Sequence, residues 1–541
     1  MSRFIRPSKY RHVFGQPGKR EYGLDNVKVS NSAWDTNMIA ASGKYISLNW
    51  NASGGGAFAI LPLPSPFQPI PDFQSRLPDI IPLARSHTAP VLDTDWSPHN
   101  DSIVASGGED GKVMIWRVED STFEGWGQEG WDPVDFDPVA RIDASPRKIG
   151  QVLFHPTAAH VLASASGEHT VKLWDLGSPE HAKSTLIGHG DAIQSIAFNP
   201  TGNLLVTTCR DRKLRMFDAR AGGEAVRSVD GHGGIKGARV VWMGEKDNIA
   251  TTGFSRMSDR QVSVWETGGL TNVKTITIDQ SAGVVMPFWS DNNILFLAGK
   301  GDGNIRYYEW ESDSLYALAE YKSTEPQRGM CFLPRRALNI ADCEIARAYK
   351  IAGSYIEPIA FIVPRKADAF QSDIFPPAQA SEPSLTAGEF FAGKTAAPKL
   401  VSLENGVITS SPGLATALPP PTRTATAPAP APAPAPAPQP IVSSPPPPSP
   451  AVASPVPAAT PVAPTPVTRR SEPEPTPISP SPVEPKAPSR SQSSAVDSSL
   501  QEENARLTAE LREAREKIRN LELQVEAIRA NARKAAALLD Q

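Results

Sequence analysis

Hydrophobic residues between about Thr36 and Arg365 occur in short runs in which apolar and polar positions alternate. Clusters of Gly, Asp, Asn and Ser separate these runs. Alternation with a period of two, bounded by turn-forming residues, is typical of antiparallel strands that bury one face. The pattern therefore predicts that this part of the chain is all-β.

The strand pattern also repeats. Each unit has a short apolar run that ends in an aromatic residue, with an acidic residue six positions before it. The aromatic residues are Trp116, Trp174, Phe217, Trp265 and Tyr308, and the acids are Asp110, Glu168, Asp211, Asp259 and Asp302. The spacing is close to the roughly 40 to 45 residues of a WD40 repeat, with one insertion around Thr122 to Asp137. Gly188-His189 and Gly231-His232 complete the GH…WD pattern of such repeats.

Two weaker units, at Asn37 to Leu63 and at Gln327 to Arg365, bring the expected number of blades to seven. The sequence thus predicts an all-β, seven-bladed WD40 β-propeller, a closed ring that leaves only short, protected sheet edges. We expect the strand that closes the ring to be Val27 to Ser30.

The composition changes sharply after the repeats. About half of the 54 prolines lie between Pro398 and Arg490, where large apolar residues are scarce. Such a segment cannot bury enough surface to offset the entropy of ordering it. The expected organisation is a propeller with a basic N-terminal segment at 1–365, a post-propeller extension packed on it at 366–406, a disordered proline-rich linker at 407–497 and an α-helical coiled coil at 498–541.

The coiled coil is predicted from apolar residues spaced alternately by four and three positions. The seam includes Leu507, Leu511, Ile518, Leu521, Val525 and Ile528. An isolated helix would expose this stripe, so we expect the chain to be a homo-oligomer. The number of chains is left open by the pattern. Asn504 at an a position is typical of dimers, whereas β-branched residues at a and d, as at Val525 and Ile528, favour higher order.

Several motifs suggest catalysis or nucleotide binding but lack the necessary context. His189 with Asp211, and His232 with Asp259, are interpreted as structural hydrogen-bonding residues of WD40 blades, because no GxSxG nucleophile accompanies them. The segment 388–395, GEFFAGKT, matches the phosphate-loop pattern, but no apolar strand precedes it and Pro398 follows it. We interpret its phenylalanines as anchors on the last blade, and Ser53 to Gly56 as a hairpin turn. No enzyme activity, cofactor or metal site is predicted.

Charge and cysteine content narrow the function further. The net charge is −4, which does not indicate nucleic-acid binding. The three cysteines lack metal-ligand spacing and are expected to be buried apolar residues. No apolar run is long enough for a transmembrane segment, and the first residues lack a secretory signal, so a cytoplasmic location is expected.

Three segments near the N-terminus carry a more specific signal. They are SKYRHVFGQP at 8–17, VKVSNSAWD at 27–35 and ASGGGAF at 52–58. Together with the order of the domains, they resemble the coronins, a family of WD40 proteins that bind actin filaments. The resemblance implies a protein that binds and cross-links filamentous actin, regulates branched nucleation by the Arp2/3 complex and acts in the cytoskeleton at cortical and endocytic actin patches.

The resemblance also implies which residues bind the filament. Lys28, in the strand-like VKVS segment, matches a basic residue of the coronin filament-binding surface. The other candidate actin-binding residues are basic and N-terminal, namely Arg3, Arg6, Lys9, Arg11 and Arg20. Opposite potentials steer partners together, and actin filaments are acidic. For Arg3, Arg6, Lys9 and Arg11 the alternative is an ordinary solvated surface charge.

In the coiled coil, the segment from Lys517 to Glu522 resembles the trimer motif of coronins, with lysine in place of the usual arginine, so a trimer is favoured over a dimer. We assign the Arp2/3 contact to the coiled coil. PxxP spacings make the linker a weaker candidate ligand of SH3 domains. The alternative function is a generic adaptor whose propeller binds peptides and not actin, which pelleting with filaments would distinguish.

Overall fold

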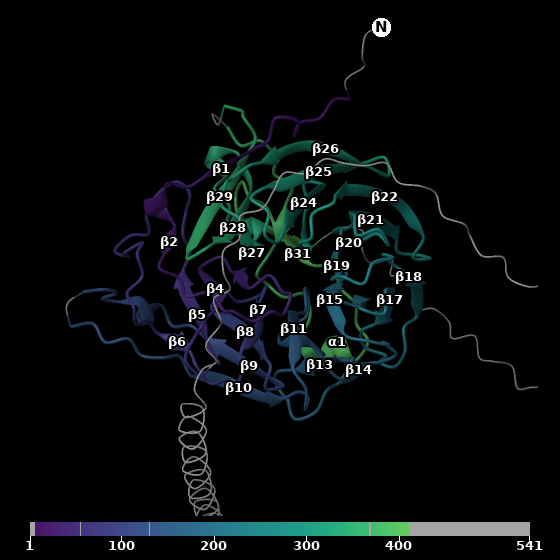
Figure 1. Cartoon of the computed structure of the whole chain (residues 1–541), viewed down its shortest axis with the longest axis horizontal. Coiled ribbons are helices and arrows are strands. Elements are labelled where there is room, and N and C mark those ends of the chain that lie inside the picture. The colour runs from purple at the N-terminus through teal and green to yellow at the C-terminus, as the bar shows by residue number, and fades with distance from the viewer. Residues whose placement is uncertain (1–5, 55, 129, 367–368, 411–541) are drawn as a thin grey trace, which may run out of the picture. The chain divides into compact units, whose positions relative to one another are not determined.

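The computed structural model describes residues 6–54, 56–128, 130–366 and 369–410. Within these ranges the chain forms seven β-sheets and one small three-stranded sheet. Figure 1 shows the seven sheets arranged radially around a centre, with β7, β11, β15 and β19 close to it. The predicted coiled coil and nearly all of the predicted linker lie outside the described residues, as does Arg3.

Six blades are four-stranded antiparallel sheets made of consecutive strands. The first blade contains β3 (Ile39–Ala41), β4 (Tyr45–Asn49), β5 (Phe58–Pro62) and β6 (Leu83–Ala84), and the second contains β7 (Val91–Trp96), β8 (Ile103–Gly108), β9 (Lys112–Arg117) and β10 (Pro138–Asp143). The third contains β11 (Ile149–Phe154), β12 (Val161–Ser166), β13 (Val171–Asp175) and β14 (Ser184–Leu186), and the fourth contains β15 (Ile193–Phe198), β16 (Leu204–Cys209), β17 (Lys213–Asp218) and β18 (Arg227–Asp230). The fifth contains β19 (Arg239–Trp242), β20 (Asn248–Phe254), β21 (Arg260–Glu266) and β22 (Asn272–Asp279), and the sixth contains β23 (Val285–Ser290), β24 (Ile294–Gly299), β25 (Ile305–Glu311) and β26 (Ser314–Tyr321).

The seventh blade joins the two ends of the ring. Its strands β27 (Gln327–Phe332), β28 (Glu344–Ala352) and β29 (Tyr355–Ile362) come from the end of the repeat region, whereas its outer strand β1 (Phe14–Pro17) comes from the N-terminal arm. In addition, β2 (Leu24–Asp25) pairs with β29. Strand β27 also contacts β3, so the first and last blades are neighbours. The described residues thus confirm the seven-bladed ring, including the two weaker units.

The predicted closing strand was wrong. Phe14 to Pro17 pairs with Ile362 to Ile359 and closes the ring, whereas in the segment 27–30 only Val29 makes a β-bridge, to Trp50. The segment has β-branched valines, but Val27 and Val29 are buried in a core cluster with residues of β3, β4 and β28 and do not form a strand ladder. An outer strand needs fewer hydrogen bonds than a central one, which is why the Gly and Pro of FGQP are tolerated there.

Residues after Ser30 cross the inner ends of several blades. The indole N–H of Trp34 donates to the carbonyl of Gly150 in β11 at 2.8 Å, and Thr36 donates to the carbonyl of Leu92 in β7. The Asp35 carboxylate pairs with Lys300 at 2.7 Å and with Arg239. Burial alone would raise the pKa of Asp35, but these two cations lower it. The segment therefore fastens four blades to one another through polar contacts.

The hydrogen bonds behind the repeat motif are complete in the second blade. The indole N–H of Trp116 donates to the hydroxyl of Ser106 at 2.8 Å, that hydroxyl bonds His87, and His87 bonds Asp110 at 3.0 Å. His87 was not recognised in the sequence because a serine, and not a glycine, precedes it. Each polar atom in this buried chain has a partner, as the core of a stable sheet requires.

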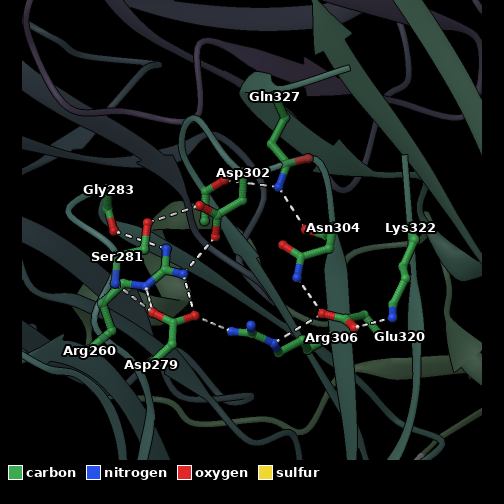
Figure 2. Close-up of polar contacts among 11 residues, drawn as sticks. Arg260, Asp279, Ser281, Gly283, Asp302, Asn304, Arg306, Glu320, Lys322 and Gln327 are labelled. Atoms are coloured by element: carbon green, nitrogen blue, oxygen red, sulfur yellow. Dashed lines mark hydrogen bonds and ion pairs between the residues drawn. The ribbon is translucent and has the colours of Figure 1, made fainter. Parts of the chain in front are cut away.

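A cluster of charges joins the fifth and sixth blades (Figure 2). Arg260, at the start of β21, is 1% exposed and donates two hydrogen bonds of 2.6 Å to Asp279. It also pairs with Asp302 of the next blade at 2.7 Å. Arg306 bridges Asp279 to Glu320. The cluster connects side chains from two sheets that have no backbone pairing with each other.

The post-propeller segment packs back onto the ring. It contains the helix α1 (Ala387–Phe391) and a sheet of β30 (Ala378–Gln379), β31 (Lys399–Val401) and β32 (Ile408–Ser410). Ile374 and Phe375 are buried against the last blades, but Phe390 packs on His155, with ring centroids 4.2 Å apart. The predicted anchoring of both phenylalanines on the last blade was therefore wrong, because α1 reaches the blades of β11 and β15.

Within the described ranges, short 3-10 helices occupy four connections. They are η1 (Arg20–Tyr22), η2 (Asp120–Phe123), η3 (Arg335–Ala337) and η4 (Ile340–Asp342). All three cysteines are buried and free, as expected. In the described part of the chain, no helix has the length and apolar character needed to span a membrane.

Candidate functional site

The N-terminal arm is anchored to the propeller by two buried side chains. Tyr10 is 4% exposed, and its hydroxyl accepts a hydrogen bond of 2.9 Å from the Asn292 side chain. The carbonyl of Val13 accepts from the Tyr307 hydroxyl, also at 2.9 Å. The RHVFG segment therefore fixes the arm between the sixth and seventh blades. These contacts also fix the backbone of the basic residues that flank this segment.

Arg6, Lys9 and Arg11 lie together on the arm, and the structure gives each a partner. Arg6 forms ion pairs with Glu309 and Glu311, and its guanidinium lies 4.3 Å from the centre of the Tyr316 ring. Burial lowers the pKa of Arg6, but its hydrogen bonds to the two glutamates outweigh this and raise it. The side chains of Lys9 and Arg11 donate to backbone carbonyls. Of the three, Lys9 is the most exposed.

Lys28 and Arg20 belong to a second group. The ammonium of Lys28 is exposed and donates to the carbonyl of Asp79 at 2.9 Å. Its backbone is rigid, because Val27 and Val29 are buried and its carbonyl accepts from Asn51 at 2.7 Å. A carbonyl does not neutralise the ammonium, which has two further donors and forms no ion pair with another described residue. Arg20 is exposed and lies 3.5 Å from Asp25.

An open groove of about 810 Å³ lies beside Lys28, and we call it the Lys28 groove. It is lined by Asn26, Gln74, Arg76, Leu77, Pro78, Asp79, Ile80, Gly127, Gln128, Trp131, Asp132 and Pro133. Asn26 adopts a left-handed conformation (φ 64°) and donates to Leu77 and Asp79, which links the Lys28 segment to the groove wall. Asparagine tolerates this conformation better than most residues.

The groove is built by two long loops. Trp126, from the insertion in the second blade, is 2% exposed and stacks on Phe73, with ring centroids 4.6 Å apart. The ring centroids of Trp131 and Trp126 are 4.7 Å apart. Side chains on the outside remain uncovered: Ile80 is 73% exposed and Val134 is 74% exposed. Exposed apolar residues together with aromatic and basic side chains are typical of protein interfaces.

The candidate residues thus divide into two groups, Arg6, Lys9 and Arg11 on the arm, and Arg20 and Lys28 near the groove. The groove itself was not predicted. Its sequence signal was the insertion around Thr122 to Asp137, which carries two tryptophans outside the repeat pattern. Nothing in the sequence shows that this loop meets the loop before Leu83.

The motifs set aside in the sequence have structural roles. His189 bonds Thr207 at 2.9 Å, and burial lowers its pKa to about 4. Asp211 binds the backbone of Gly190 and not His189 directly. His232 likewise bonds Thr251, while Asp259 accepts from Ser255.

The phosphate-loop match at 388–395 has the wrong structure for a nucleotide site. Helix α1 begins one residue before the motif and occupies its first half, with a capping box between Thr386 and Glu389, and Lys394 pairs with Glu389 at 2.8 Å. Ser53 to Gly56 connects the hairpin strands β4 and β5, as predicted. A Cβ at Gly56 would lie 1.6 Å from the carbonyl oxygen of His87, so a larger residue does not fit there.

The fold defines a WD40 β-propeller, and family models agree. "WD domain, G-beta repeat" matches residues 81–117, 136–175 and 181–218, and "Type of WD40 repeat" matches 356–398. "Domain of unknown function (DUF1899)" matches residues 3–67, which include the arm and Lys28.

Known relatives identify the particular family. The chain is 48% identical over 412 residues to "Coronin-like protein crn1" of Schizosaccharomyces pombe, with 74% of this chain and 65% of the relative covered. It is 41% identical to "Coronin-A" of Dictyostelium discoideum, with 75% of this chain and 88% of that relative covered. A crystal structure of the WD40 domain of Toxoplasma gondii coronin matches with a TM-score of 0.66 and 29% identity, covering 73% of this chain and 98% of that one.

The chain belongs to the coronin family, as its N-terminal segments predicted. It spans 65% of the length of the Schizosaccharomyces pombe relative. Membership agrees with the expectation of a scaffold protein that is not an enzyme.

Proposed function

We propose that this protein is a non-enzymatic scaffold that binds actin filaments through the part of the propeller that holds Lys28 and the Lys28 groove. The observation that carries the proposal is the uncompensated ammonium of Lys28, held on a rigid segment beside exposed Ile80. A charge fixed next to apolar surface can pair with an acidic group while its neighbours exclude water. Family membership supports actin as the partner.

The basic arm adds to this proposal unequally. Lys9 and Arg20 are exposed and can contribute to attraction toward an acidic filament, with Arg20 pairing with the single carboxylate of Asp25, whereas Arg6 is neutralised by two glutamates. An arginine that is paired with two carboxylates adds no net positive charge at its position, so Arg6 does not attract an acidic partner. We therefore assign Arg6 to anchoring the arm and keep Lys28, Lys9 and Arg20 as contact residues.

The proposal extends to filament cross-linking and to regulation of branched nucleation. Cross-linking requires two filament sites on one particle, and the predicted coiled coil joins chains, with a trimer favoured. We assign the contact with the Arp2/3 complex to the same segment and place the protein at cortical actin patches. The proline-rich linker is a candidate ligand of SH3 domains.

Pelleting with actin filaments tests binding and cross-linking together. The full chain is expected to pellet saturably with filaments at high speed and to pull filament bundles down at low speed. A chain ending at Asp497 is expected to retain high-speed pelleting but to lose bundling, because it has one site per particle. Full chain that stays in the supernatant would contradict filament binding, and bundling by the shortened chain would contradict the role of the coiled coil.

A further inference from the structure

A second groove lies where the post-propeller sheet meets the ring. It has a volume of about 420 Å³ and is separate from the Lys28 groove. Its walls carry Trp242 and Trp289 from the fifth and sixth blades, Pro156 and Pro200 from earlier blades, and Pro376, Pro377, Pro398 and Leu400 from the post-propeller segment. We call it the tryptophan groove.

The two indoles give this groove its chemistry. Trp242 and Trp289 are half-buried, and among the described residues neither indole N–H has a hydrogen-bond partner. Gly244 (φ 58°) leaves room for Trp289, since a Cβ there would lie 2.8 Å from the indole nitrogen. Aromatic grooves with free indole donors suit polyproline II segments, whose rings stack on the aromatic faces and whose carbonyls lack internal hydrogen bonds.

The chain itself supplies such a segment next to the groove. Strand β32 pairs with β31 so that Thr409 lies opposite Leu400 and Ser410 opposite Lys399. Strand β32 therefore ends opposite Lys399, whose neighbours Pro398 and Leu400 both line the groove. The residues that follow read SPGLATALPPPT at 411–422 and include three consecutive prolines, Pro419 to Pro421.

We propose that the tryptophan groove is a docking site for the start of the proline-rich segment, residues 411–422 of the same chain, bound as a polyproline II helix. Twelve residues in this conformation extend about 37 Å at roughly 3.1 Å per residue, which keeps Pro419 to Pro421 within reach of a groove that begins beside the end of β32. A segment tethered this closely has an effective concentration of about 1 mM, so an intrinsic Kd of about 0.1 mM gives roughly 90% occupancy. Docking would fix where the linker leaves the propeller.

Selective chemical labelling of tryptophan tests the proposal on the full chain. 2-Hydroxy-5-nitrobenzyl bromide reacts with accessible indoles, and mass spectrometry gives the rate at each site. In the variant Pro419→Ser, Pro420→Ser, Pro421→Ser, we expect Trp242 and Trp289 to react at least about five-fold faster than in the wild type, as the occupancy above implies. Trp131 in the Lys28 groove is the internal reference and should not change.

A matched control carries three Pro→Ser changes at Pro445, Pro446 and Pro447, in the later proline run, and should label like the wild type. Both sets of changes lie outside the propeller, so a failure of folding does not obscure the result. Equal labelling of the wild type and the Pro419–Pro421 variant would overturn the proposal. Protection of the wild type that disappears on dilution would overturn it as well, because the occupant would then come from a second copy. The test contains no actin and is independent of filament binding.

Discussion

Replacing Arg260 with methionine is expected to lower the free energy of unfolding by about 3 to 5 kcal/mol. The guanidinium is 1% exposed and is shared by Asp279 and Asp302, which belong to different blades. Methionine keeps much of the volume but leaves two partly buried carboxylates with fewer partners. Arg306 still pairs with Asp279 in the variant, so Asp279 keeps one partner. The loss of unfolding free energy should therefore not exceed this range.

The measurement is guanidinium-induced unfolding of the full chain followed by tryptophan fluorescence. All 11 tryptophans lie before residue 366, so the signal reports on the propeller alone. Arg256→Met is the matched control, because Arg256 lies on the same blade but is exposed, and its effect should stay within about 0.5 kcal/mol. Similar losses in the two variants would contradict the role of the cluster.

Acid provides a second readout of the same cluster. Burial alone would raise the pKa of Asp279, but hydrogen bonds from Arg260 and Arg306 hold it well below its usual range. A lowered carboxyl pKa contributes stability above the unfolded value of about 3.9, and this stability is lost as the pH falls toward the folded value. The difference in stability between the wild type and Arg260→Met should therefore narrow as the pH falls below about 4. A difference in unfolding free energy that does not change with pH would mean that Arg260→Met destabilises the protein through lost packing and not through lost ion pairs.

Reversing the charge at Lys28 is expected to have the largest effect on function. Lys28→Asp places a like charge against an acidic filament, which we expect to cost about 3 kcal/mol, or on the order of 100-fold in affinity. Because the Lys28 ammonium is exposed, the free energy of unfolding of the variant should differ from that of the wild type by no more than about 0.5 kcal/mol. A titration of labelled protein with filaments gives the affinity, and a thermal melt checks the fold.

Lys274→Asp is the control for Lys28→Asp. Lys274 is exposed on β22 of the fifth blade, and its replacement by aspartate changes the net charge by the same amount as Lys28→Asp. We expect it to weaken binding only slightly, through long-range potential that salt screens. Equal weakening by both variants would show that total charge, and not the Lys28 position, controls binding.

The blades could be predicted from the sequence because each one repeats a local pattern. An apolar run ending at Trp116 or Trp174 needs only its neighbours in the chain to form a strand. The closing strand could not be found in this way, since Phe14 to Pro17 contains a glycine and a proline and pairs with residues about 345 positions away. The β-branched Val27 and Val29 gave a stronger local signal, but they are buried in the core beside β3 and β4 without forming a strand.

The candidate site shows the same limit. Lys28 was identified through its family resemblance, but the groove beside it depends on Trp126 meeting Phe73 from another blade. The partners of Arg6 lie about 300 residues away, so its neutralisation could not be read locally. The predicted linker boundary at 407 also falls inside a hairpin, because Ile408 to Ser410 pairs with β31. These features arise from packing between distant segments.

Hydroxyl-radical footprinting of the full chain, free and bound to actin filaments, tests the proposed binding surface most directly. Ile80 and Val134 at the Lys28 groove are 73% and 74% exposed, and Met257 on the fifth blade is 84% exposed, so all three are open to oxidation in the free protein. Filaments are expected to slow oxidation of Ile80 and Val134 several-fold and to leave Met257 unchanged. Filament binding that protects neither Ile80 nor Val134 would contradict the assignment of the filament site to this surface.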